Sequence, residues 1–108
     1  MSSTGHESPT LHIEARPEGG LIVSGELDLA TAPQLRAALE RLTTDDGPEQ
    51  VVLDLSGLRF CDSSGLSVFV QSHQAMRDAG RTLVLDRPTQ RLRDLLATTA
   101  LDNELDVR

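Results

Sequence analysis

A carboxylate and two hydroxyl groups stand directly before an apolar pattern typical of an amphipathic helix, in the segment Asp62-Ser63-Ser64-Gly65. In the first turn of a helix, the backbone N–H groups have no partners within the helix, and the positive end of the helix dipole lies there. A phosphate on the Ser63 hydroxyl would meet those donors and that partial charge. The segment therefore predicts a regulatory site that is switched by phosphorylation of Ser63.

Each of these residues also has a purely structural interpretation. Ser63 can cap the helix, which contributes about 1 kcal/mol. Ser64 is either the alternative phosphate acceptor or a first-turn hydrogen-bonding residue. Asp62 either positions the Ser63 hydroxyl or caps the helix itself. Gly65 either lets a partner backbone or a phosphate approach closely or is a tolerated first-turn glycine.

The sequence does not predict an enzyme. Ser63 is not part of a Gly-x-Ser-x-Gly motif, and no Gly-rich phosphate-binding loop is present. The histidines His6, His12 and His73 do not have metal-ligand spacing, and the single cysteine, Cys61, excludes a cysteine-based metal cluster. We therefore expect no catalytic residue, no metal and no cofactor, and Ser63 would be the substrate of another enzyme.

The composition is that of a small acidic protein. The 108 residues carry a formal net charge of −7, which would repel a phosphate backbone, and two Phe without Trp or Tyr offer almost no surface for base stacking. Nucleic-acid binding is therefore not expected, and the acidity suits solubility or a basic protein partner. No apolar run approaches the ~20 residues that span a bilayer, and no signal peptide is evident. We expect a cytoplasmic protein without membrane contact.

Apolar periodicity predicts one α/β domain over residues 10–108, preceded by a disordered polar tail over residues 1–9. The expected strands are Leu11–Ala15, Leu21–Ser24, Val51–Leu55 and Thr82–Leu85. The expected helices are one capped by Thr31 with Gln34 in a capping box, one over Ser63–Ala79 ended by Gly80, and one opened by Pro88. The last segment, Leu101–Val107, is either an edge strand or a helix turn. The alternation predicts a mixed, mostly parallel sheet packed with about three to four helices.

The strand Val51–Leu55 is almost wholly apolar, which is typical of a strand buried on both faces of a parallel sheet. We expect it to end in a short loop that delivers Asp62 to the helix. Asp54 would be a polar residue at a strand end or a sheet edge. Cys61 would be a small core or loop residue whose thiol pKa a nearby helix start could lower.

Three segments resemble the STAS domain of bacterial anti-sigma factor antagonists: Gly25-Glu26-Leu27-Asp28, Val52-Leu53-Asp54-Leu55-Ser56 and Phe60-Cys61-Asp62-Ser63-Ser64-Gly65-Leu66. The segment Pro88–Leu96 is similar to the family's late helix, so the resemblance runs from Leu11 to the C-terminus. One departure is Thr99-Ala100-Leu101, where the family often has glycine in the middle. Alanine resists the left-handed conformation that glycine allows there.

The resemblance implies a partner, a switch and a surface. The partner is an anti-sigma factor that is also a serine kinase; binding it releases a sigma factor, and the kinase phosphorylates Ser63 to end the binding. A serine phosphatase of the PP2C type removes the phosphate. Asp28, otherwise a turn residue before the first helix, would join Asp62, Ser63, Ser64 and Gly65 in the partner-binding surface. The alternative is a STAS scaffold, or an accessory subunit of a stress-signalling or transporter complex, without a phospho-switch.

Overall fold

A five-stranded sheet in the order β1-β2-β3-β4-β5 forms the centre of the computed structural model, which describes residues 10–43 and 47–108. The strands are β1 (Leu11–Ala15), β2 (Leu21–Leu27), β3 (Gln50–Cys61), β4 (Thr82–Asp86) and β5 (Asp106–Val107). β1 pairs with β2 in antiparallel fashion, and the remaining pairs are parallel. This confirms the mixed, mostly parallel sheet. The expected tail over residues 1–9 lies outside the described residues.

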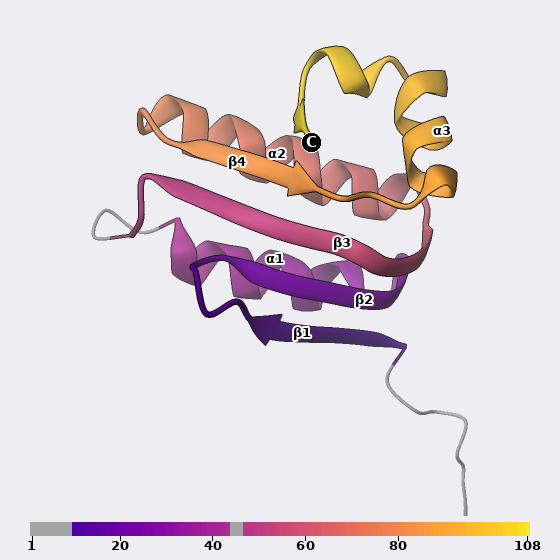
Figure 1. The fold of residues 1–108 in the computed structure, drawn as a ribbon, viewed down its shortest axis with the longest axis horizontal. Helices are drawn as coiled ribbons and strands as arrows, with labels where there is room; N and C mark the ends of the chain where they lie inside the picture. Colours follow the sequence, from indigo (N-terminus) through magenta and orange to yellow (C-terminus); the bar gives the residue numbers. More distant parts are fainter. Residues whose placement is uncertain (1–9, 44–46) are drawn as a thin grey trace, which may run out of the picture.

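Three α-helices accompany the sheet in the described part of the chain. They are α1 (Ala32–Leu42), α2 (Ser63–Asp78) and α3 (Gln90–Thr98), and a 3₁₀ turn (Leu101–Asn103) follows α3. α1 and α2 lie behind the sheet in Figure 1, whereas α3 stands at the end where β3 finishes. The last segment is therefore both a helix turn and a short edge strand. None of the helices in the described ranges is long and apolar enough to cross a bilayer.

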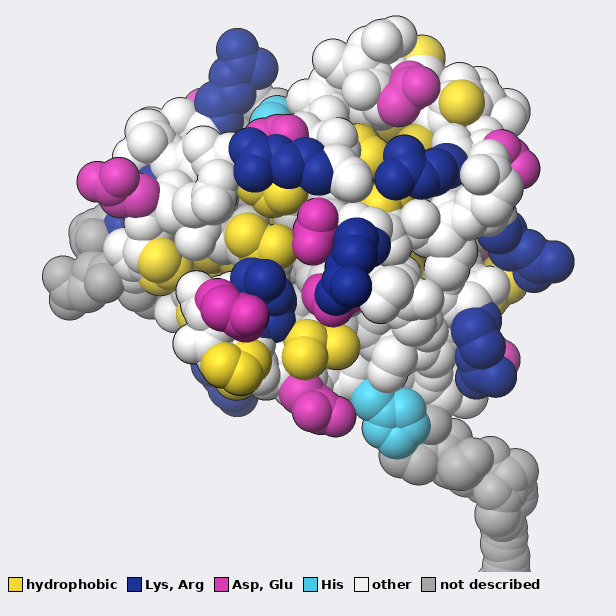
Figure 2. Space-filling view, viewed as in Figure 1, with side chains coloured by type: hydrophobic (Ala, Val, Ile, Leu, Met, Phe, Trp, Pro, Cys, Tyr) yellow, Lys and Arg dark blue, Asp and Glu magenta, His cyan; other side chains and the backbone are white. Residues whose placement is uncertain are grey.

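The core lies between the sheet and the pair α1 and α2. Alternate residues of the central strands and one stripe of each helix point into it, as the two periodicities require. Its fully buried side chains include Val23, Leu27, Leu35, Leu39, Val51, Leu53, Leu55, Phe69 and Met76. In the described part of the chain no helix covers the opposite face of the sheet, which carries interspersed basic and acidic side chains (Figure 2).

β2 and β3 are longer than the sequence suggested. β3 continues through Ser56 and Gly57 to Cys61, so the loop expected after Leu55 does not exist. β2 likewise continues through Gly25 to Leu27. The pairing register of the two strands shifts twice in this stretch, and Gly25 then lies opposite Leu58 and Leu27 opposite Cys61. Tertiary pairing overrides the local turn chemistry of these residues.

Asp54 also differs from expectation, since it lies within the central strand rather than at an end or an edge. It is 8% exposed, and Ser56 donates to its Oδ1 from both the backbone nitrogen (3.0 Å) and the hydroxyl (2.8 Å). The Arg87 guanidinium pairs with its other oxygen on the helix-free face. Burial alone would raise the pKa of Asp54, but these partners together outweigh it and lower the pKa below its ordinary 3.8.

Two expectations about helix ends were partly wrong. Pro88 does not open α3 but precedes the N-cap residue Thr89, whose hydroxyl accepts a hydrogen bond from the Leu92 backbone nitrogen (3.2 Å). Ala100 takes the left-handed conformation (φ +62°) after α3, although alanine disfavours it. The end of α2 agrees with the prediction, because Gly80 follows it with φ +73°.

Candidate functional site

The candidate site is formed where the parallel strands β2 and β3 end side by side. Glu26 pairs with Phe60 and Leu27 with Cys61, and the Asp62 backbone nitrogen donates to the Leu27 carbonyl oxygen (3.1 Å). Asp28 and Asp62 therefore follow neighbouring strand ends. The carboxyl edge of a parallel sheet is where α/β proteins place their binding residues, so the two segments singled out in the sequence meet at one site.

Asp62 is the N-cap of α2. Its backbone is extended (φ −110°, ψ −170°), and its Oδ1 accepts hydrogen bonds from the backbone nitrogens of Ser64 (2.9 Å) and Gly65 (3.3 Å). The capping interpretation is thus confirmed for Asp62 and wrong for Ser63. Two of the first-turn donors that a phosphate on Ser63 was expected to meet are already occupied by this carboxylate.

Ser63 is the first residue of α2 and is exposed, whereas Ser64 is half-buried. The Ser63 carbonyl oxygen accepts a hydrogen bond from the Ser67 hydroxyl one turn later (3.0 Å), which holds the backbone of this turn. Ser63 is therefore the more accessible of the two candidate serines, and it lies on a rigid helix start.

Gly65 faces the interior. A Cβ atom at this position would lie 2.6 Å from Cγ of Leu27 and 2.7 Å from Sγ of Cys61. Only a residue without a side chain lets the first turn of α2 lie this close to the ends of β2 and β3. The structure thus gives Gly65 an internal packing role, and the close approach of a partner stays a prediction.

Asp28 organises the turn between β2 and α1. Its Oδ1 accepts hydrogen bonds from the backbone nitrogens of Ala30 and Thr31 (both 3.0 Å), and its own backbone nitrogen donates to the Thr31 hydroxyl (2.9 Å). The expected capping box is absent: Thr31 makes no side-chain cap bond, and the Gln34 amide donates instead to the Leu11 carbonyl oxygen (3.2 Å). The turn interpretation of Asp28 is correct, and its half-buried carboxylate still lines the surface of the site.

Cys61 ends β3 with its thiol turned toward the packed side of the site, where it contacts the position of Gly65. Burial, and then the negative charge of Asp62, raise the pKa of the Cys61 thiol to about 12. The expectation that the helix start would lower this pKa is therefore wrong. The thiol is protonated at neutral pH and is a weak nucleophile.

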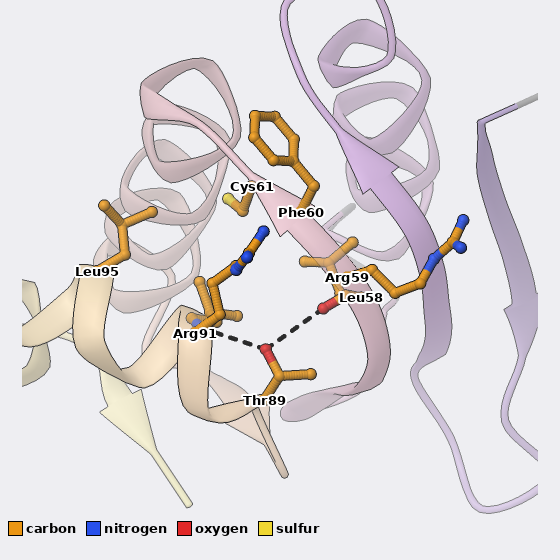
Figure 3. A pocket seen from close by; sticks show the side chains of 8 residues that line it. Leu58, Arg59, Phe60, Cys61, Thr89, Arg91 and Leu95 are labelled. Carbon is orange, nitrogen blue, oxygen red and sulfur yellow. Dashed lines mark hydrogen bonds between the residues drawn. The ribbon is translucent and has the colours of Figure 1, made fainter.

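An open cleft adjoins the strand ends and contains residues that the sequence analysis did not assign to the site. Its lining is Glu26, Asp28, Arg59, Phe60 and Arg91. Figure 3 shows Arg91 reaching from α3 toward Phe60 and Cys61. The Thr89 hydroxyl donates to the Leu58 carbonyl oxygen (3.4 Å) and so ties the start of α3 to β3. Arg91 thus borders the site.

Comparison with known proteins decides the family. The family described as "Mlab, STAS domain" matches residues 12–107, nearly the whole chain. The chain belongs to the STAS-domain family. A STAS-domain relative, the anti-sigma-B factor antagonist of Listeria monocytogenes, is 34% identical over 104 residues, covering 94% of this chain and 83% of the relative.

Solved structures agree with the STAS assignment. An anti-sigma factor antagonist from Mycobacterium paratuberculosis has a TM-score of 0.70 and 29% identity, covering 91% of this chain and 83% of that one. The unphosphorylated form of the anti-sigma factor antagonist SpoIIAA has a TM-score of 0.72 over 91% of this chain and 87% of its own. Its phosphorylated form, from Bacillus, has a TM-score of 0.67 over 91% and 90%. Both SpoIIAA forms are 18% identical to this chain and show that the fold is shared.

The chain thus belongs with the anti-sigma factor antagonists, which are non-enzymatic regulators, as the sequence predicted. Within the described ranges, the His, Cys, Asp and Glu side chains form no group of three that could hold a metal ion. What the site offers chemically is an accessible hydroxyl at a preformed helix start, bordered by carboxylates and a mixed-charge cleft.

Proposed function

We propose that this protein binds an anti-sigma factor that is also a serine kinase, that binding releases a sigma factor, and that phosphorylation of Ser63 ends the binding. The observation that carries the proposal is the position of Ser63, exposed at the first residue of α2 where β2 and β3 end. Since sigma factors act in transcription, the encounter takes place in the cytoplasm. The binding is assigned to the domain formed by residues 10–108.

The partner-binding surface in this proposal is made of Asp28, Asp62, Ser63 and Ser64, with Gly65 contributing from within. The side chains of Asp28 and Asp62 are anchored by backbone donors, so the surface is formed before the partner arrives. A preformed surface loses little conformational entropy on binding. Gly65 keeps the surface continuous by holding the helix start against Leu27.

The phosphoryl step needs nothing from this chain beyond the hydroxyl. The kinase transfers the γ-phosphoryl group of ATP to the Ser63 oxygen, ADP leaves, and a base of the kinase takes the hydroxyl proton. A PP2C-type phosphatase hydrolyses the phosphoserine and restores the hydroxyl. Specificity for Ser63 over Ser64 follows from exposure, because Ser64 is half-buried.

The effect of the phosphate is local exclusion of the partner. A phosphoserine adds about −1.5 to −2 charges, while Asp62 already occupies the Ser64 and Gly65 donors. The phosphate therefore stays on the outside of the helix start. A close-packed partner would have to desolvate this charge and make room for it, and both costs oppose binding. The named relatives support this regulation, since SpoIIAA has been solved in both phosphorylated and unphosphorylated forms.

A pull-down with candidate anti-sigma kinases, with and without ATP, tests the proposal. Wild-type protein should bind without ATP and be released with it, and Ser63→Ala should stay bound in both conditions. Ser64→Ala is the matched control and should behave as wild type, and mass spectrometry should find one phosphate on Ser63. Binding that persists with ATP would contradict the switch and favour the scaffold alternative.

A further inference from the structure

Two large hydrophobic side chains are exposed in the described part of the chain, Leu29 at 77% and Phe60 at 42%. Single exposed apolar residues are common on protein surfaces. The exposure of Phe60 is notable because the chain is poor in aromatics, with two Phe and no Trp or Tyr.

Both side chains lie at the carboxyl ends of β2 and β3. Leu29 directly follows Asp28, and Phe60 directly precedes Cys61 at the end of β3. Asp28 and Phe60 line the same open cleft, and Phe60 is the register partner of Glu26. Leu29 and Phe60 therefore both lie at the strand ends from which Asp62 and Ser63 begin α2.

Charged side chains of both signs border this apolar surface. Arg59 and Arg91 line the cleft from β3 and α3, and Glu26 and Asp28 line it from the β2 side. In Figure 3, Phe60 projects from β3 while Arg91 reaches toward it from α3. Apolar centres with a charged rim are the usual anatomy of a protein–protein interface, and aromatic residues are enriched at such centres.

We propose that Leu29 and Phe60 are the apolar anchors that hold the anti-sigma factor on this surface. The inference rests on the function proposed above and names the contacts that supply its affinity. The matching face of the anti-sigma factor has an apolar hollow for each anchor, acidic groups opposite Arg59 and Arg91, and basic groups opposite Glu26 and Asp28. Affinity and switching are then separate: the anchors set how tightly the complex forms, and Ser63 sets when it ends.

The test measures the Kd of the wild type, Leu29→Ala and Phe60→Ala for the anti-sigma kinase in the absence of ATP. Each substitution should weaken binding about ten-fold or more, the range of an interface hot spot. Thermal melts should stay unchanged for Leu29→Ala, because an exposed side chain contributes little to folding. Leu29→Glu is the second variant and should weaken binding further without loss of fold.

Ile22→Ala is the matched control, because it removes a branched aliphatic side chain from the start of β2, opposite Asp54 and away from the cleft. Its Kd should stay within about two-fold of wild type. If the folded Leu29 and Phe60 variants bind as tightly as wild type, these residues are not the anchors. If ATP still dissociates those complexes, the proposed function stands. A wild type that binds no anti-sigma kinase would overturn both.

Discussion

The carbonyl oxygen of Leu27 accepts a 3.1 Å hydrogen bond from the backbone nitrogen of Asp62. This bond joins the end of β2 to the start of α2, although the two residues are far apart in the chain. Because Leu27 also packs against Gly65, the turn that holds Asp28 and the helix start that holds Ser63 are in direct contact. A substitution in the turn should therefore alter the conformation of the helix start, and a substitution in the helix start should alter the turn.

Removal of the Asp62 cap should destabilise the fold. Asp62→Ala leaves the Ser64 and Gly65 backbone donors without their acceptor and should lower the free energy of unfolding by about 1 kcal/mol. Urea denaturation measures this change. Asp62→Asn should recover most of it, and Ser63→Ala should cost less than about 0.5 kcal/mol because an exposed non-capping residue is removed. Equal losses for Ser63→Ala and Asp62→Ala would refute the assignment of the cap.

A methyl group at Gly65 should separate α2 from the strand ends. Gly65→Ala places a Cβ atom 2.6 Å from Leu27 Cγ and 2.7 Å from Cys61 Sγ, and should destabilise by about 1–3 kcal/mol through overpacking. Adding Cys61→Ala removes one of the clashing atoms. The double variant should then lose less free energy of unfolding than the two single variants together. Strict additivity in this double-mutant cycle would mean that Cys61 does not crowd the position.

Glycine at position 100 should stabilise the protein. Ala100 has φ +62°, a conformation that costs an L-residue roughly 1–2 kcal/mol. Glycine removes this strain but adds freedom to the unfolded chain, so Ala100→Gly should gain about 0.5–1 kcal/mol. Ala37→Gly, at an exposed position in the interior of α1, is the control and should lose about 1 kcal/mol. Thermal melts that move in the same direction for both variants would contradict the prediction.

The pairing of Asp54 with Arg87 and Ser56 should make stability depend on acid pH. The pKa of Asp54 is lowered in the folded state, so its contribution is present above the unfolded value of about 3.8 and is lost as pH falls through the lower folded value. Asp54→Asn should lack this component. Free energies of unfolding measured from pH 6 down to about pH 2 should fall less steeply for Asp54→Asn than for wild type. Parallel curves would argue against the pairing.

The Cys61 thiol should resist alkylation in the folded protein. Its pKa is raised to about 12 by burial and by Asp62, so the thiolate that reacts is scarce at pH 8. Iodoacetamide should therefore modify native protein slowly and urea-unfolded protein at the rate of an ordinary thiol. Mass spectrometry follows both reactions. Equal rates in the two states would show that the thiol is neither buried nor shifted.

The order of elements and the bounds of α2 could be predicted because they depend on local patterns. Helical spacing of apolar residues and the final Gly80 are visible in the chain itself. The full length of β3 could not be predicted, because Ser56 and Gly57 have the local chemistry of a turn. Pairing with a distant strand, through shifted register, keeps them extended.

The sequence left two roles open for Asp28 and for Asp62, and the structure supports the turn for Asp28 and the helix cap for Asp62. Asp62 and Ser63 are both residue types that cap helices, and the choice between them follows from the bond between Asp62 and Leu27, which sequence does not show. The exposure of Phe60 and the position of Arg91 depend on where α3 lies against β3. Such long-range placement leaves no signal in a residue pattern.

Under the proposed switch, a phosphate on Ser63 would be added to a helix start whose Ser64 and Gly65 backbone donors are already bonded to Asp62. The Asp62 carboxylate could therefore keep both of its bonds when the phosphate is added. Under the proposed switch, the tempo of the signal is then set outside this molecule. The rates of the kinase and the phosphatase would then determine how long this protein stays in each form.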